Sequence, residues 1–270
     1  MGRLAVQGRR VTVNRKTFKE HLRRFMPRTI RPHRILGGPL RGRMIVTSWH
    51  DYPGAILGRT ERALLEWFRH SVRAGETWLD VGAHYGYTAI ALSELVGPEG
   101  RVFAFEPVLS TAGHLGRTRA LNNLSQLTVL PLGLGSPQGF ELRQVPVVRG
   151  MADSTVRPGR GSAETFLVAR LDAIWRNICG GRPRIDGVKI DVQGMEIDTL
   201  DGMAGVLGEF KPRLALELHR GVDRDQVLDR IESFGYSRTG FPVDVDMENE
   251  DQRSGALYLD DLSYVFPART

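Results

Sequence analysis

The sequence predicts an α/β fold in which a mostly parallel sheet is covered by helices on both faces. From Glu76 onward, short apolar runs alternate with segments of helical periodicity, as expected for a parallel sheet. The apolar run at 78–81 breaks into a glycine turn that leads directly into an aliphatic helix. The chain has 270 residues, which is long enough to bury the core of one such domain.

The elements of this domain follow from the positions of the apolar runs. We expect strands at 77–81, 101–106, 127–132, 186–191 and 213–218, and one or two closing strands within 256–266. We expect helices between them, near 86–95, 109–122, 195–206 and 223–234. Ahead of this alternation, 44–58 predicts a short strand and a turn, and 59–73 predicts a helix with one apolar side.

The N-terminal segment is strongly basic. Residues 1–43 hold thirteen Arg and Lys residues against the single acid Glu20, so the remainder of the chain has a net negative charge. Phe18, Leu22, Phe25 and Met26 share one face of a predicted basic helix. We therefore divide the chain into a basic arm and cap, 1–58, and the α/β domain, 59–270. We expect the arm to pack on that domain.

Two other roles for the arm stay open, namely contact with an anionic membrane surface and formation of a homodimer. Nucleic acid is disfavoured because the basic residues lack interleaved aromatics.

No apolar run approaches the roughly 18 residues of a membrane span, and no secretory signal is recognisable. Cys179 is the single cysteine, which argues against disulfides and zinc–thiolate sites. We expect a cytoplasmic protein, peripheral at a membrane if the arm binds one.

The glycine turn has the pattern Asp80-x-Gly82-x-His84-x-Gly86. A buried strand, a glycine turn and a helix N-terminus together form a cradle that a ligand can approach closely. The next strand ends in Glu106, an acid placed to hold ribose hydroxyls. The turn therefore predicts a nucleoside cofactor, with a plain strand-to-helix connection as the alternative. Its spacing is not the G-x-G-x-x-G of dinucleotide-binding proteins.

A second group of polar residues follows the strand at 186–191. Lys189, Asp191 and Gln193 alternate with apolar neighbours and share one face, at the strand end where open α/β sheets bind ligands. Glu217 and His219 share one face of the next strand, and the ordinary pKa of His219 would suit a base. The alternatives are a structural ion pair of Lys189 and a merely hydrogen-bonded histidine.

Four separated motifs occur in the order found in one known family. They are Trp-Leu-Asp-Val-Gly-Ala-His-Tyr-Gly-Tyr at 78–87, Gly-Arg-Val-Phe-Ala-Phe-Glu-Pro at 100–107, Leu-Asp at 171–172, and Lys-Ile-Asp-Val-Gln-Gly-Met-Glu at 189–196. From about residue 52 to residue 219 the chain resembles the FkbM family of class I S-adenosylmethionine-dependent methyltransferases. The resemblance implies a Rossmann-like sheet of seven strands with the last strand antiparallel. It also implies O-methylation of small molecules, sugars or glycolipids.

By the same resemblance, the cofactor site is made of residues in the glycine turn and at the next strand end: Asp80, Gly82, His84, Tyr85, Gly86 and Glu106. Lys189 and Asp191 would face the transfer site. Two departures stand out. The family usually has Asn at the position of His84, which implies that the contact with the methionine end is altered or that the imidazole reaches the acceptor. It usually has Glu where this chain has Gln193, so a charge that could act as base or metal ligand is absent.

The leading hypothesis is an S-adenosylmethionine-dependent O-methyltransferase. Asp191 is the first choice of base and His219 the second, and Lys189 would orient Asp191 or lower its pKa. The hypothesis leaves open a divalent metal held by Asp191 and Glu217. Two alternatives are a nicotinamide-dependent oxidoreductase and a non-catalytic protein that binds nucleic acid or membranes through its arm. We expect acceptor choice to depend on loops at 44–58, 150–162 and 236–255.

Overall fold

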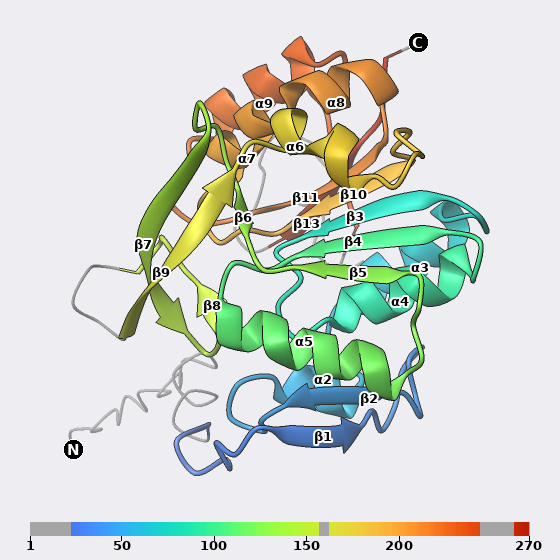
Figure 1. Ribbon diagram of the computed structural model, residues 1–270, viewed down its shortest axis with the longest axis vertical. Coiled ribbons are helices and arrows are strands. Elements are labelled where there is room, and N and C mark those ends of the chain that lie inside the picture. Colours follow the sequence, from blue (N-terminus) through green and yellow to red (C-terminus); the bar gives the residue numbers. More distant parts are fainter. Residues whose placement is uncertain (1–22, 157–161, 244–261, 270) are drawn as a thin grey trace, which may run out of the picture.

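The computed structural model describes residues 23–156, 162–243 and 262–269 (Figure 1). Its central sheet has seven strands in the order β12-β13-β11-β10-β3-β4-β5. The parallel strands are β3 (Thr77–Val81), β4 (Arg101–Phe105), β5 (Leu127–Leu130), β10 (Gly187–Ile190) and β11 (Arg213–Leu218). The last strand, β13 (Leu262–Phe266), pairs antiparallel with β11 and with the short β12 (Phe241–Pro242). The predicted Rossmann-like, doubly wound fold is confirmed.

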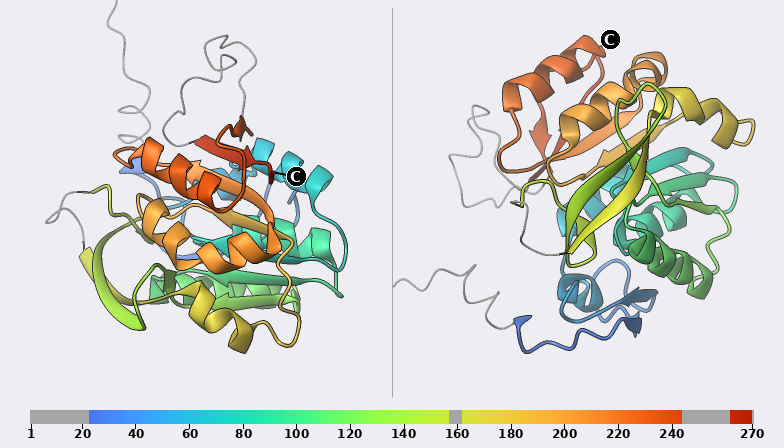
Figure 2. Two further views of the ribbon diagram at one scale, coloured as in Figure 1. Left: turned by 90° about the horizontal axis from the view of Figure 1, so that it is seen from above. Right: turned by 60° about the vertical axis from the view of Figure 1, so that its left-hand side comes forward.

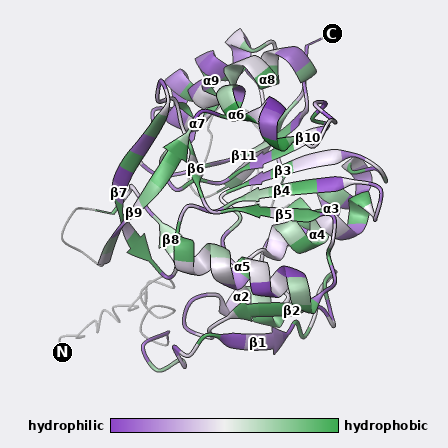
Figure 3. Cartoon of the chain, viewed as in Figure 1, coloured by the Kyte–Doolittle hydropathy of each residue, from purple (hydrophilic) through white to green (hydrophobic). Residues whose placement is uncertain are grey.

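Helices cover both faces of this sheet (Figures 1 and 2). On one face lie α6 (Leu171–Ile178), α7 (Glu196–Gly202), α8 (Ala204–Phe210) and α9 (Arg224–Ser233). On the other face lie α3 (Arg62–Ser71), α4 (Tyr87–Val96) and α5 (Leu109–Leu121). Helix α9 contains many hydrophilic residues, whereas β4 and β5, which lie between the helix layers, are mainly hydrophobic (Figure 3).

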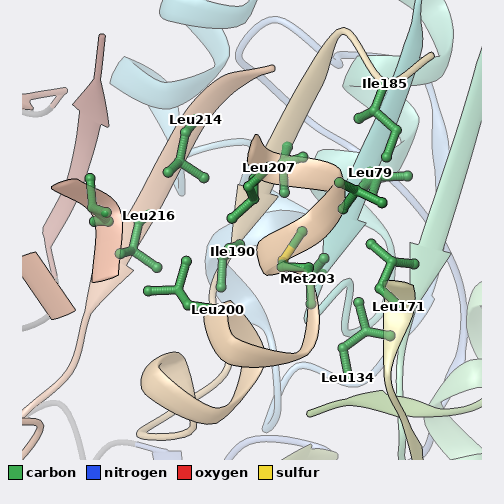
Figure 4. Close-up of a cluster of buried hydrophobic side chains, with 14 of the residues drawn as sticks. Leu79, Leu134, Leu171, Ile185, Ile190, Leu200, Met203, Leu207, Leu214 and Leu216 are labelled. Carbon is green, nitrogen blue, oxygen red and sulfur yellow. The ribbon is translucent and has the colours of Figure 1, made fainter. Parts of the chain in front are cut away.

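Each central strand contributes to two cores because successive side chains point to opposite faces. Leu79 packs with Ile190 and Leu216 beneath α7 and α8 (Figure 4), whereas its neighbour Trp78 packs on the face of α3 and α4. Ala215 in β11 points to the Trp78 side. This burial of both faces explains why the strands appear in the sequence as nearly continuous apolar runs.

The helix predicted at 195–206 is in fact two helices, α7 and α8, separated at Met203. At the break, Gly202 lies so close to Gly135 that a β-carbon would be 1.8 Å from the Gly135 carbonyl oxygen. The new helix start is capped from α6, because the Asp172 carboxylate accepts hydrogen bonds from the backbone N–H groups of Gly205 and Val206, both at 2.9 Å.

The segment 44–58 forms a strand and a short helix where we predicted a strand and a turn. Strand β2 (Met44–Thr47) pairs antiparallel with β1 (Arg31–Arg34), and α2 (Pro53–Leu57) begins with a proline at its first turn. The cap, residues 31–58, packs against α5 (Figure 2, right). Because its apolar side chains share a core with α3 and α4, the division of the chain at residue 58 stays a prediction.

Most of the basic arm lies outside the described residues. Of the predicted apolar face, Phe18 and Leu22 fall there, and Phe25 is 80% exposed. Among the described helices, none is long and apolar enough to cross a membrane.

A second sheet, which the sequence analysis did not predict, stands beside the ends of the parallel strands. It has the order β6-β9-β7-β8 and consists of β6 (Gly133–Leu134), β7 (Phe140–Val148), β8 (Met151–Ala152) and β9 (Ser162–Ala169). β7 and β9 form a long antiparallel hairpin at the left of Figure 1. Part of the predicted loop at 150–162 forms β8, and residues 157–161 lie outside the described residues.

The contact between cap and α5 gives a first prediction. Asn122 exchanges hydrogen bonds with both backbone groups of Met44, at 2.9 and 2.7 Å. Replacing Asn122 by Ala leaves these groups without a partner, so we expect the free energy of unfolding to fall by about 1–3 kcal/mol. Urea denaturation measures this change. The matched Asn177→Ala variant, at an exposed position in α6, should unfold like the wild type. An equal effect of the two substitutions would show that the Asn122 contacts do not stabilise the cap.

Candidate functional site

The carboxyl ends of β3, β4, β10 and β11 open into one cavity. Its walls come from the glycine turn after β3, from the second sheet and from the cap. The charged residues of the lining are Arg23, Asp51, Glu61, Glu106, Arg143, Arg149, Lys189, Asp191 and Glu217. This is the edge at which open parallel sheets bind ligands.

The two outer glycines of the turn are required by close packing. Gly82 has φ +80° and Gly86 has φ +92°, backbone conformations that favour glycine. A β-carbon on Gly82 would lie 1.7 Å from the Asp191 carbonyl oxygen, and one on Gly86 would lie 2.1 Å from a Leu115 methyl group. The sequence analysis attributed these glycines to the approach of a ligand. The structure gives them a packing function, and Gly82 also lines the cavity.

Glu106 follows β4 and is 3% exposed. Its carboxylate accepts hydrogen bonds from the backbone N–H groups of His84, at 2.8 Å, and Val108, at 2.9 Å, one on each oxygen. Burial raises the pKa of Glu106 to about 8, although both hydrogen bonds favour the charged form. Each oxygen keeps one lone pair, so the carboxylate can accept two further hydrogen bonds from neighbouring hydroxyls in the cavity. A ribose fits this arrangement.

His84 lines the cavity, and its ring lies against that of Tyr52, with 4.9 Å between the centroids. Its Nε2 is 2.9 Å from the backbone oxygen of Arg149. Burial lowers the pKa of His84 to about 3, so the imidazole is neutral at pH 7.

Three other residues of the expected cofactor set lie behind the lining. Tyr85 is 1% exposed and donates to Asp51 at 3.1 Å, and Gly86 packs against α5. Asp80 is fully buried and accepts a hydrogen bond from Thr88 at 2.7 Å. These positions suit residues that shape the turn. For Asp80, Tyr85 and Gly86, contact with a cofactor stays a prediction that the cavity lining does not support.

Lys189 connects the two strands on which the site is built. Its ammonium group lies 3.2 Å from Asp80 and 3.6 Å from Asp191, and it donates to the backbone oxygen of Gly82 at 3.0 Å. Burial alone would lower the pKa of Lys189, but the two carboxylates raise it above its ordinary value. Burial also opposes the charged form of Asp191, yet Lys189 and His219 lower its pKa. Asp191 is therefore a carboxylate at neutral pH.

His219 is surrounded by three carboxylates and is 2% exposed. Its Nδ1 lies 2.6 Å from Glu196, and its Nε2 lies 3.3 Å from Asp191 and 3.4 Å from Glu217. Burial would lower the pKa of His219, but hydrogen bonds to Glu196 and Glu217 outweigh it and raise the pKa to about 10. Without another cation in the cluster, the imidazole is protonated at pH 7. This charge state disfavours the second choice of base.

The expected metal pair, Asp191 and Glu217, lies together with His219. Each of the three offers one ligand atom, and these atoms lie within 4.8 Å of one another. The sequence analysis had placed Glu217 and His219 on one face but had not combined all three.

Sequence reasoning missed Glu61, which lines the cavity from the cap side at the start of α3. Its φ of +52° is unusual for a residue other than glycine. Burial and the charges of Glu217 and Asp191 raise the pKa of Glu61 to about 8. No signal in the sequence identifies this residue, because it belongs to no recognised motif and reaches the site only through the packing of the cap.

Comparisons with known proteins place the chain in a family. Residues 80–238 match the model of the methyltransferase FkbM domain. The hexuronic acid methyltransferase AglP of Haloferax volcanii is 27% identical over 172 residues, a match that covers 63% of this chain and 66% of that protein. The match thus spans slightly less than two thirds of the relative's length.

Solved structures with a similar chain course include the FkbM methyltransferase from Methylobacillus flagellatus. It is 19% identical, with a TM-score of 0.47, and the match covers 75% of this chain and 50% of that one. Fibrillarin from Aeropyrum pernix, solved with bound S-adenosyl-L-methionine, is 13% identical with a TM-score of 0.47, and 89% of each chain is covered.

The buried pair of Lys189 and Asp80 yields a stability prediction. Lys189→Met leaves the fully buried Asp80 without its cation, and we expect the free energy of unfolding to fall by about 3–5 kcal/mol. Adding Asp80→Asn removes the buried carboxylate that has lost its cation, and the double variant should therefore recover part of the lost free energy of unfolding. Denaturation of the two single variants and the double variant measures the coupling. Strictly additive effects would show that the two side chains do not stabilise each other.

Proposed function

The chain belongs to the FkbM methyltransferase family, and on that premise we propose that it transfers the methyl group of S-adenosylmethionine to an oxygen of a small molecule, sugar or glycolipid. One observation carries the proposal. The same cavity contains Glu106, which has lone pairs left for a ribose, and the charged group of Lys189 and Asp191. A nucleoside cofactor and an acceptor can therefore meet at one edge of the sheet.

The residues present fit the cofactor. In the proposal, Glu106 holds the ribose, and the turn from Gly82 to His84 borders the methionine end. When bound, S-adenosylmethionine supplies a methyl group that is already electrophilic, because its sulfur is positively charged. The protein therefore contributes mainly by aligning the acceptor oxygen, and such positioning accounts for several kcal/mol of barrier lowering.

Asp191 is the residue we propose to face the acceptor. It is ionised, and its orientation is fixed by Lys189 on one side and by the Gln193 amide, 3.0 Å away, on the other. During transfer, as the methyl–sulfur bond breaks and S-adenosylhomocysteine leaves, this carboxylate would accept the proton of the acceptor hydroxyl, a contribution worth typically 10²–10⁴-fold in rate. Lys189 acts through Asp191, and His219 acts as a positioning residue with Glu196 behind it.

A sugar acceptor is supported by the polar lining of the cavity. Carboxylates and guanidinium groups line it from the cap, the core and β7, and these groups pair with hydroxyls or with a sugar carboxylate. The similar protein from Haloferax volcanii is a hexuronic acid methyltransferase. We therefore propose a sugar, and among sugars an acidic one, as the first acceptor to test.

The function of the basic arm stays open among three alternatives. Packing on the domain, an anionic membrane surface and a second copy of the chain all stay predictions, because residues 1–22 lie outside the described residues. The family assignment argues against a nicotinamide-dependent oxidoreductase, as does the spacing of the glycine turn.

Cofactor binding gives the first functional prediction. S-adenosylhomocysteine should bind the wild type at a pH above the raised pKa of Glu106, where this side chain is ionised. Glu106→Gln should weaken that binding by about tenfold to a hundredfold, since hydrogen bonds to a charged acceptor contribute about 1.5–3 kcal/mol. Isothermal titration calorimetry measures both affinities. Glu99→Gln, at an exposed position between α4 and β4, is the matched control. A wild-type protein that binds NADH but not S-adenosylhomocysteine would refute the proposed function.

Turnover gives the second prediction. Asp191→Ala should abolish methyl transfer, measured as S-adenosylhomocysteine release with a panel of neutral and acidic sugars, because the acceptor loses the group that orients and deprotonates it. Binding of S-adenosylhomocysteine should survive in this variant. Unchanged turnover would remove Asp191 from the mechanism, and loss of cofactor binding would place it in the cofactor site instead.

A further inference from the structure

We propose that Asp191, Glu217 and His219 form a binding site for one divalent first-row cation, of which Mn²⁺ is the natural probe. The three residues come from the carboxyl ends of the adjacent strands β10 and β11. His219 Nε2 lies 3.3 Å from an Asp191 oxygen and 3.4 Å from a Glu217 oxygen. Ligand atoms bound to a common metal at about 2.0–2.2 Å lie at similar separations from one another.

The histidine is held as metal-bound histidines are held. Glu196, which is fully buried, lies 2.6 Å from Nδ1 of His219. This contact directs the other ring nitrogen, Nε2, towards Asp191 and Glu217. A ligating histidine almost always donates its second N–H to a carboxylate, a carbonyl or water, which fixes its tautomer and orientation.

A hydrogen-bond donor, the side-chain amide of Gln193, already lies between the proposed ligand atoms. The amide nitrogen of Gln193 lies 2.7 Å from His219 Nε2 and 3.0 Å from the same Asp191 oxygen. The amide N–H can donate to Nε2 only when this ring nitrogen is unprotonated, the state that also binds a metal. The amide therefore occupies the point at which a cation would fit. A dication there interacts with two carboxylates, whereas the neutral amide brings no net charge.

The charge balance of the cluster favours a cation. The nearby ammonium group of Lys189 is already shared between Asp80 and Asp191. Glu217 lies 3.4 Å from His219 and 3.5 Å from the Ser263 hydroxyl. With Glu196 also bound to His219, the carboxylates outnumber the cationic side chains in these contacts. A bound dication would offset that excess.

The ligand types restrict the ion. One imidazole nitrogen and two carboxylate oxygens form a mixed set that suits Mn²⁺, Fe²⁺ or Zn²⁺ better than Mg²⁺, which prefers oxygen ligands alone. Three protein ligands leave further coordination positions open, and both Asp191 and Glu217 line the cavity. A cation here would polarise an acceptor oxygen, and Asp191 would then serve as a ligand.

The cation site is tested independently of methyl transfer. Full-length protein treated with EDTA is titrated with MnCl₂, and free Mn²⁺ is followed by electron paramagnetic resonance. We expect one ion per chain, with binding weakened more than about tenfold in Glu217→Gln and Asp191→Asn. Glu196→Gln should weaken binding by about 10–100-fold, the usual effect of losing the partner of a ligand.

Glu209→Gln is the matched control, since this exposed carboxylate pairs with Arg176 on the surface. Circular dichroism verifies that each variant is folded, and two ligand variants are used in case one is not. Binding weaker than about 1 mM in the wild type, or equal binding by the wild type and both ligand variants, would overturn the proposal. Intact Mn²⁺ binding without S-adenosylhomocysteine binding would preserve this site and refute the proposed function.

Discussion

The candidate site depends on one buried ammonium group. Lys189 joins Asp80 on β3 to Asp191 at the end of β10, and it also holds the backbone oxygen of Gly82. Without this cation, the fully buried Asp80, the Asp191 carboxylate and the Gly82 carbonyl would face each other, and the cost of burying Asp80 would go uncompensated. Lys189 therefore links the glycine turn, the pair of strands β3 and β10, and the charge state of Asp191.

Much of this arrangement could be predicted from the sequence because it follows from parallel strands. Strands β3 and β11 lie where their apolar runs predicted them, since both faces of each strand are buried. Parallel neighbours also end at the same edge, so an acid that follows one strand must lie near an acid that follows the next. That rule placed Asp191 beside the β3 turn, and Glu217 and His219 beside Asp191.

Other features could not be predicted because they depend on contacts between distant segments. The break between α7 and α8 arises where Gly202 meets Gly135, and the hairpin of β7 and β9 is half exposed and carries Pro146. The full burial of Asp80 could not be predicted for a related reason, since a motif names a residue but does not say whether its side chain faces the cavity or the core. The protonation of His219 depends on Glu196, which lies on the helix that follows β10.

Part of the cavity wall comes from residues outside the segment that matches the family. The family match begins at residue 80, yet Asp51 and Tyr52 of the cap and Glu61 at the start of α3 line the cavity. Glu61 adopts a left-handed backbone conformation there, and a conformation of this cost persists only where surrounding contacts enforce it. The strand ends can supply the cofactor edge and the charged group, whereas the opposite wall is built by the cap. We therefore expect acceptor selection to depend on residues that lie outside the family match.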